Sequence, residues 1–156
     1  MAKKRSGLTA LNITDTVLFM ATNSRLASAL HIMSFVAYAG DEGTTSEAIA
    51  KSLKTNPVVV RKILRLLDRE GLVALRQGRH GGVGLQLRAS GITLGQIYKA
   101  VESESGVFAM RGQVHDGCAV ACAMKRRLRP IFNAANNAVE QALSKTSLAE
   151  LIRGIS

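Results

Sequence analysis

The sequence predicts a mostly helical protein with one small two-stranded hairpin. Apolar residues recur at helical spacing over most of the chain from residue 23 onward. Of the 156 residues, 47% are hydrophobic but only 4% are aromatic, so the core must be built from aliphatic side chains, which favours helices over a sandwich or a barrel. A connection with three glycines in six residues separates two short apolar runs, at 72–76 and 83–87, as is typical of a hairpin.

Capping residues predict where the helices begin and end. Asn56 is a favourable N-cap and Pro57 suits the first helical position, while Gly40 and Gly71 can adopt the left-handed backbone that ends a helix. Helices are therefore expected over residues 23–39, 45–53, 57–70, 92–102, 119–143 and 147–153.

The order of these elements predicts a winged helix-turn-helix. Two helices joined by a short turn are followed by a hairpin, and in such a fold the second of these helices enters the DNA major groove. The predicted fold class is mostly α, with a two-stranded wing and a long C-terminal dimerisation helix. The expected divisions are a poorly ordered extension (1–22), the winged domain (23–102), a loop with a candidate sensor cysteine (103–118) and the dimerisation helices (119–156).

The positive charge of the chain indicates a polyanionic partner. Lys and Arg number 21 against 11 Asp and Glu, which gives a net charge of +10. Half of this excess lies within residues 61–88, on the expected second helix and the hairpin. Because such a concentration suits nucleic acid better than an anionic membrane surface, we expect a DNA partner and no membrane.

Candidate DNA contacts lie on the helix that begins at Pro57 and on the hairpin. Arg and Asn can form paired hydrogen bonds with base edges, Val can contact a thymine methyl group, and a basic hairpin tip can enter a minor groove. Asn56 has an alternative role, since its side chain can cap the helix instead. The candidates are Thr55, Asn56, Val58, Val59, Arg61, Lys62, Arg65, Arg76, Arg79 and His80.

Three segments also resemble a known family. The sequences TNPVVVRKILRLLDREGLV, QGRHGGVGLQL and GITLGQIYKAVE, in this order and spacing, are similar to the Rrf-type winged-helix regulators, which include IscR and NsrR. The resemblance implies that the third helix and the wing bind DNA and that the long C-terminal helix forms a homodimer. It also implies repression of genes in response to a redox or metal-cluster signal.

Cys118 and Cys122 are candidate redox-sensing residues. Asp116 is expected to cap a helix with Cys118 in its first turn, where free N–H groups and the helix dipole would stabilise a thiolate. Inert thiols and a metal or cluster site remain alternatives. The iron–sulfur members of the family carry three cysteines in this region, whereas this chain has two, so it resembles the members without a cluster and no cofactor or metal is expected.

Beyond Cys122 an apolar stripe on the last long helix predicts a homodimer, which would bind a palindromic operator. These patterns together predict a cytoplasmic, sequence-specific transcriptional regulator that acts as a repressor, with thiol oxidation at Cys118 as its candidate switch. An iron–sulfur sensor of the same fold and a non-sensing architectural DNA-binding protein are alternatives. No phosphate loop, acid pair or other catalytic motif indicates an enzyme.

Overall fold

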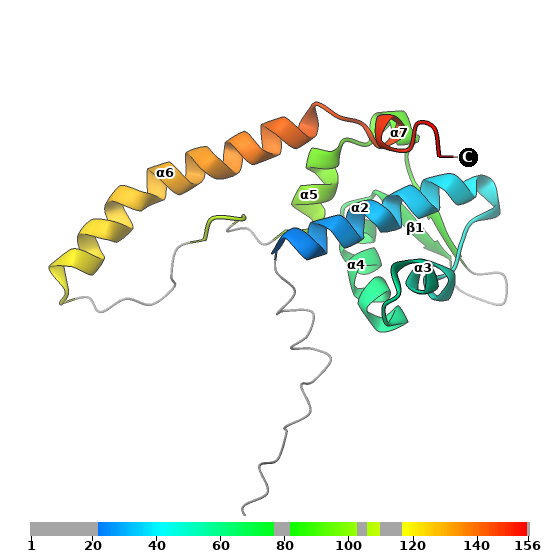
Figure 1. The fold of residues 1–156 in the computed structure, drawn as a ribbon, viewed down its shortest axis with the longest axis horizontal. Coiled ribbons are helices and arrows are strands. Elements are labelled where there is room, and N and C mark those ends of the chain that lie inside the picture. Colours follow the sequence, from blue (N-terminus) through cyan, green and yellow to red (C-terminus); the bar gives the residue numbers. More distant parts are fainter. Residues whose placement is uncertain (1–21, 77–81, 103–105, 110–116, 156) are drawn as a thin grey trace, which may run out of the picture.

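The structure is a computed structural model and describes residues 22–76, 82–102, 106–109 and 117–155 (Figure 1). Residues 1–21, nearly all of the expected N-terminal extension, lie outside the described residues. The predicted fold class is confirmed, because the described chain is mostly helical with one two-stranded antiparallel sheet. The elements in chain order are α2 (Thr22–Ala39), η1 (Gly40–Glu42), α3 (Ser46–Leu53), α4 (Pro57–Arg69), β1 (Val73–Arg76), β2 (Gly82–Leu85), η2 (Ala89–Gly91), α5 (Leu94–Val101), α6 (Ala119–Ser144) and α7 (Leu148–Leu151).

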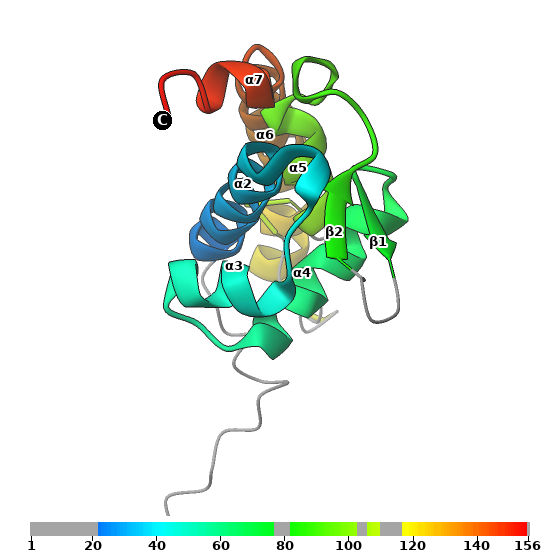
Figure 2. The same cartoon turned by 90° about the vertical axis from the view of Figure 1, so that its right-hand side faces the viewer.

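The helices α2 to α5 and the hairpin β1–β2 enclose one hydrophobic core, and we call these elements the winged unit (Figure 2). Its largest side chains are aliphatic, as the low aromatic content predicts. Burial of each such side chain contributes about 1.5–3 kcal/mol. The largest fully buried residues are Ile32, Met33, Ile49, Ile63, Leu64, Leu67, Ile92, Ile97 and Leu148.

The hairpin is hydrogen-bonded to the segment that precedes α3. Within the hairpin, Val73 pairs with Leu85 and Arg76 with Gly82. Thr44 forms a further antiparallel bridge to Val83, in which Thr44 N donates to Val83 O at 3.1 Å and Val83 N donates to Thr44 O at 2.7 Å. These two hydrogen bonds therefore connect the base of the wing to the start of the helix-turn-helix.

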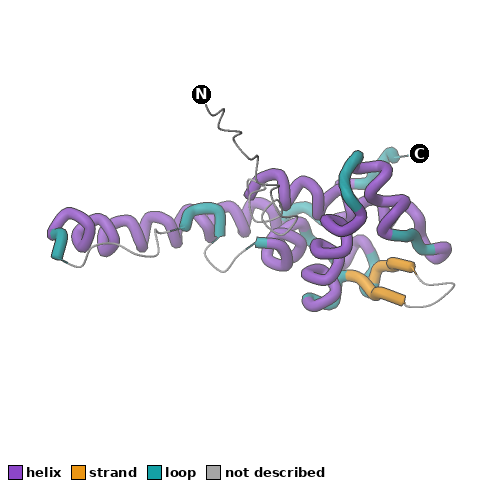
Figure 3. The backbone as a smooth tube through the Cα atoms, turned by 90° about the horizontal axis from the view of Figure 1, so that it is seen from below, coloured by secondary structure: helices purple, strands orange, loops and turns teal. Residues whose placement is uncertain are grey.

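The two C-terminal helices differ in how they are packed. The helix α6 extends away from the winged unit, opposite to the hairpin (Figure 3), and has no buried residue. The short helix α7 returns to the winged unit, where Leu148 is fully buried and its N–H donates to Ile92 O at 2.8 Å. The expected division at residues 118 and 119 therefore places α7 in the wrong unit, because Leu148 belongs to the winged core.

Candidate nucleic-acid interface

The turn between α3 and α4 is fixed by two capped helices. At the start of α3, Ala48 N donates to Thr45 Oγ1 at 3.2 Å. The helix ends at Lys54, which adopts the left-handed conformation with φ of 51°. Asn56 then caps α4, since Val58 N donates to Asn56 Oδ1 at 2.8 Å. The capping role that the sequence offered as an alternative for Asn56 is therefore present.

The helix α4 has a wide buried face that includes one of the predicted DNA contacts. Val59 is only 7% exposed and packs with Val60, Ile63 and Leu67 in the core. The prediction that Val59 contacts DNA is wrong, because the buried face of α4 already includes Val59, next to Val60. The other predicted contacts on this helix or its cap are exposed or half-buried: Thr55, Asn56, Val58, Arg61, Lys62 and Arg65.

Arg61 joins α4 to α3, an interaction that the sequence analysis did not predict. Its Nη2 forms an ion pair with Glu47, and its Nε donates to Ser46 Oγ at 3.2 Å. The pKa of Glu47 is lowered, first by a hydrogen bond from its own backbone N–H and then by Arg61 and Ser46. The two partners lie 14 residues apart in the chain, so no local sequence pattern could reveal this contact.

Cationic side chains from α4 and the hairpin meet in one groove, which we call the arginine groove. This groove has a volume of about 410 Å³ and is lined by Arg61 and Arg65 of α4 and by Arg76 of β1. Thr45 and Glu47 at the start of α3 close one side. The structure thus brings together three of the predicted contacts, although they come from two different elements of the chain.

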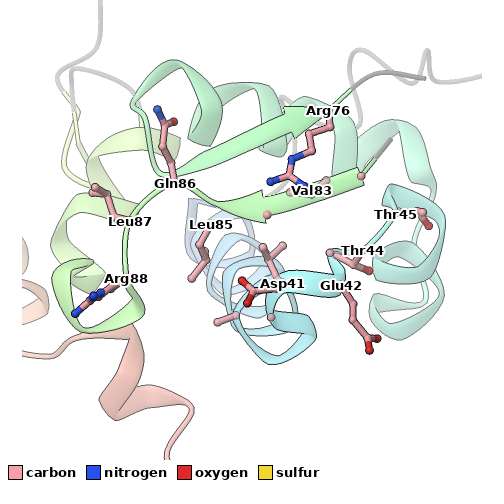
Figure 4. Close-up of a pocket in the computed structure, with 16 residues that line it drawn as sticks. Asp41, Glu42, Thr44, Thr45, Arg76, Val83, Leu85, Gln86, Leu87 and Arg88 are labelled. Atoms are coloured by element: carbon pink, nitrogen blue, oxygen red, sulfur yellow. The ribbon is translucent and has the colours of Figure 1, made fainter. Parts of the chain in front are cut away.

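A second groove lies on the other side of the wing base. It has a volume of about 740 Å³, and Figure 4 shows Arg76 and Val83 on the hairpin, with Asp41 and Glu42 on the segment across from them. Asp41 and Glu42 form no ion pair with other described residues and would repel phosphate, whereas Glu47 in the arginine groove is paired with Arg61, so the arginine groove is the better candidate surface for DNA. Arg79 and His80, the predicted contacts at the wing tip, lie outside the described residues.

The cysteines lie at the start of α6. Cys118 occupies the N-cap position without a side-chain capping bond, and not the first helical turn as predicted. Cys122 follows one turn later, and its backbone N–H donates to Cys118 O at 3.0 Å. Both cysteines are exposed and no disulfide joins them. Asp116, the expected cap, lies outside the described residues, and within the described ranges no group of three His, Cys, Asp or Glu residues could hold a metal ion.

The helix α6 carries three exposed large apolar side chains. Val120, Met124 and Ile131 of α6 are 71%, 46% and 59% exposed. Met124 and Ile131 belong to the apolar stripe predicted beyond Cys122, but Leu143 and Phe132 of the same stripe contact their own chain, since Leu143 packs against the core and the ring of Phe132 lies 5.9 Å from that of Phe108. The stripe is therefore divided between the winged unit and solvent.

Comparisons with known proteins agree with this geometry. Residues 22–154 match the family model of the Rrf2 iron-dependent transcriptional regulators. The chain is 35% identical over 130 residues to YwnA of Bacillus subtilis, provisionally named an HTH-type transcriptional regulator, and the match covers 83% of this chain and 96% of that protein.

Solved structures share the fold. A crystal structure described provisionally as a DNA-binding protein is 31% identical, with a TM-score of 0.65, over 83% of this chain and 99% of that one. The global cysteine regulator CymR of B. subtilis is 22% identical, with a TM-score of 0.58, over 83% of this chain and 93% of that one. Among the described residues, no helix is long and apolar enough to cross a membrane.

Proposed function

Because this chain belongs to the Rrf2 family of transcriptional regulators, we propose that it is a DNA-binding repressor that recognises a palindromic operator as a homodimer. The observation that carries this proposal is the arginine groove, where Arg61, Arg65 and Arg76 line the space between α4 and the hairpin. A row of cations beside an exposed helix start suits the phosphate backbone that flanks a major groove. We assign the protein no catalytic activity, and we expect it to act in the cytoplasm.

The first two turns of α4, with the residues just before them, would lie against base edges in the major groove. Thr55, Val58 and Lys62 are the side chains that we assign to this contact, with Val58 facing a thymine methyl group. Asn56 uses Oδ1 for its cap and keeps only its Nδ2 donors, so the paired contact with adenine, which needs both atoms, is excluded while the cap is intact. Arg65, further along the helix, would contact phosphate.

Arg61 is better assigned to positioning than to base recognition. A paired contact with guanine needs two free donors on one edge of the guanidinium group. Nη2 is paired with Glu47 and Nε with Ser46, so the Nε–Nη2 edge is occupied, and a paired contact could use only the Nη1–Nη2 edge, on which Nη2 is shared with Glu47. Arg61 would therefore hold α4 at its angle to α3, and its remaining donors would face the DNA backbone.

The wing would add contacts outside the major groove. Arg76 at the end of β1 is exposed and lines the arginine groove, which places its charge where a phosphate backbone would pass. Arg79 and His80 follow in the connection between the strands, and we propose that they reach the adjacent minor groove.

The helix α6 would form the dimer. It has no buried residue, and its exposed Val120, Met124 and Ile131 would be covered by the same helix of a second copy. A two-fold axis through this contact would set two winged units about one helical turn of DNA apart, roughly 34–36 Å.

Cys118 would sense oxidation without an iron–sulfur cluster. Its thiol is exposed at the start of a helix of 26 residues, where an oxidant can reach it. Oxidation to a sulfenic acid by a peroxide would alter the start of α6, and through it the spacing of the two winged units.

Selection from a random pool of DNA duplexes, followed by a gel shift, tests DNA recognition. We expect an enriched palindrome that binds at least about a thousandfold more tightly than random DNA. Arg65→Ala should reduce the slope of affinity against salt by about one ion. Lys145→Ala, which removes a positive charge at the C-cap of α6, is the matched control. Equal affinity for selected and random duplexes would instead indicate an architectural protein.

A gel shift on the selected duplex, with and without hydrogen peroxide, tests the thiol switch. Cys118→Ala is the informative variant, because a serine at this N-cap position would add a capping hydrogen bond and stabilise α6 by itself. We expect peroxide to lower the affinity of the unmodified protein and to leave Cys118→Ala unchanged. An equal loss in both proteins would rule out Cys118 as the sensor.

A further inference from the structure

The turn between α3 and α4 carries a lysine whose presence the proposed DNA contacts do not explain. Lys54 follows α3 with φ of 51° and ψ of 45°, which is the left-handed conformation. Among the residues that the structure describes, Lys54 is the only one other than glycine with a positive φ. A Cβ atom is unfavourable in this conformation, and glycine is the usual residue where a helix ends in this way.

The turn needs this backbone conformation but not the lysine side chain. Lys54 N donates to Lys51 O at 3.2 Å, and Thr55 N donates to Ala50 O at 3.0 Å. These bonds pair carbonyl groups in the last turn of α3, and neither of them involves the side chain of Lys54. Glycine would form both bonds without the unfavourable backbone, so the geometry of the turn does not account for a lysine.

The chain around this turn is cationic. From Ala48 to Leu67 the sequence has five Lys or Arg and no Asp or Glu. Lys51 and Lys54 are both exposed at the end of α3, and the other three cations lie on α4: Arg61, Lys62 and Arg65. An exposed surface of this composition favours a polyanion.

The turn and the arginine groove lie at opposite ends of α3. Thr45 and Glu47 at the start of this helix line the arginine groove, whereas Lys54 follows its last residue. The helix has eight residues and is therefore about 12 Å long. The major groove of DNA is also about 12 Å wide, with one phosphate strand along each side. The two cationic surfaces are thus separated by about the width of one major groove.

We propose that the α3–α4 turn binds the second phosphate strand of the operator, across the major groove from the strand at the arginine groove, and that Lys54 makes this contact. Its ammonium group donates to a phosphate oxygen, and Lys51 lies beside it. This inference rests on the proposed function, in which α4 occupies the major groove. Contacts to both strands fix the position of α4 in the groove, which the base contacts of Val58 and Lys62 require.

A stabilising role of Lys54 in α3 is the competing explanation. A cation near the C-terminus of a helix interacts favourably with the helix dipole. Thermal unfolding of the full chain without DNA tests this role. We expect Lys54→Gly to have a Tm equal to or above that of the parent protein, because glycine removes the unfavourable backbone. A lower Tm together with unchanged operator affinity would assign Lys54 to the helix end and overturn the proposal.

Operator affinity is then measured over a range of salt concentrations. Lys54→Gly and Lys54→Ala should both bind the selected duplex about threefold or more weakly at low salt, and the slope of log affinity against log salt should fall by about one. Lys54→Arg keeps the charge and should restore both quantities. Lys145→Gly removes a positive charge at the C-cap of α6 and should change neither. An unchanged affinity and slope in Lys54→Gly would overturn the proposal.

Neutral methylphosphonate groups, placed one at a time in the selected duplex, identify the strand that each cation contacts. The parent protein should lose affinity when the neutral group replaces a phosphate on either side of the major groove. Lys54→Gly should become insensitive on one side, and Arg65→Ala on the other side. Loss of sensitivity at the same phosphates in both variants would contradict the contact with two strands.

The outcomes distinguish this proposal from the proposed function. A parent protein that selects no DNA sequence would refute the proposed function and the Lys54 contact with it. A parent protein that selects a palindrome, while Lys54→Gly binds that palindrome equally well, would refute the Lys54 contact alone.

Discussion

The helices α4 and α6 both carry apolar residues at helical spacing, yet their own chain buries this face fully only in α4 and covers it only in part in α6. In α4, Val60 and Leu67 are fully buried and Ile63 is 1% exposed. In α6 no residue is buried, and Ile131 is 59% exposed. The first helix is stabilised by the core of the winged unit, whereas the second leaves apolar side chains such as Ile131 exposed to solvent. Helical period alone therefore predicts an apolar face but not which molecule covers it.

The largest expected effect contrasts one isoleucine from each helix. Ile63→Ala should destabilise the protein by about 2–5 kcal/mol, because it removes a buried side chain and leaves a cavity in the core. Ile131→Ala should lower the free energy of unfolding far less, when it is measured at a protein concentration so low that no second copy covers α6. Urea unfolding of both variants measures the difference, and equal losses would mean that α6 is as well packed as α4.

A second substitution tests what covers α6. Ile131→Asp should weaken self-association about tenfold or more, since it places a charge in the proposed dimer contact. Gln141→Glu adds the same charge at an exposed polar position of α6 and is the control. Sedimentation equilibrium measures both dissociation constants. A dimer that tolerates Ile131→Asp as well as the control would exclude this face from the interface.

The two helices also differ at their starts. Asn56 caps α4 through its side chain, whereas Cys118 begins α6 without such a bond. Asn56→Ala should therefore destabilise the winged unit by about 0.5–2 kcal/mol. Asn137→Ala, at an exposed position within α6, should change stability little. Thermal unfolding compares them, and an Asn56→Ala protein as stable as the parent would mean that the cap contributes nothing.

The smallest expected effect concerns the contact that orients α4. Because the folded-state pKa of Glu47 is below its ordinary value, its charged form stabilises the fold above the unfolded-state value, and this contribution is lost as the pH falls through the folded-state pKa. Glu47→Gln should thus lower Tm slightly at neutral pH and converge with the parent protein in acid. Glu42→Gln, an exposed acid outside the ion pairs of the described chain, is the control. A Tm difference that persists unchanged in acid would contradict the assignment.

Local patterns predicted the elements well because local chemistry determines them. Asn56 and Pro57 predicted the start of α4 through hydrogen-bond capping and a fixed φ, and the glycine-rich connection predicted the hairpin. The error at Val59 has a geometric cause. Val60, Ile63 and Leu67 recur at helical spacing on one narrow face, but α4 packs against α3, α5 and β1 together, so its buried face is wider and includes Val59.

The candidate site was only partly predictable because it depends on tertiary packing. Composition and charge identified Arg61, Arg65 and Arg76 as candidates, but their meeting in one groove depends on how the hairpin packs beside α4. The pair of Arg61 with Glu47 and the burial of Glu102 against Arg25 join residues that are far apart in the chain. The helical spacing of residues in the sequence does not predict such contacts.

The return of α7 to the winged unit has a consequence for the order of folding during synthesis. The core of the winged unit includes Leu148, and Leu94 N donates to Thr146 O at 2.9 Å beneath the start of α5. The DNA-binding unit therefore cannot complete its core until the ribosome has finished α6. A nascent chain thus acquires the helix proposed for dimerisation before its DNA-binding surface is fully stabilised, which would couple assembly of the dimer to maturation of the winged unit.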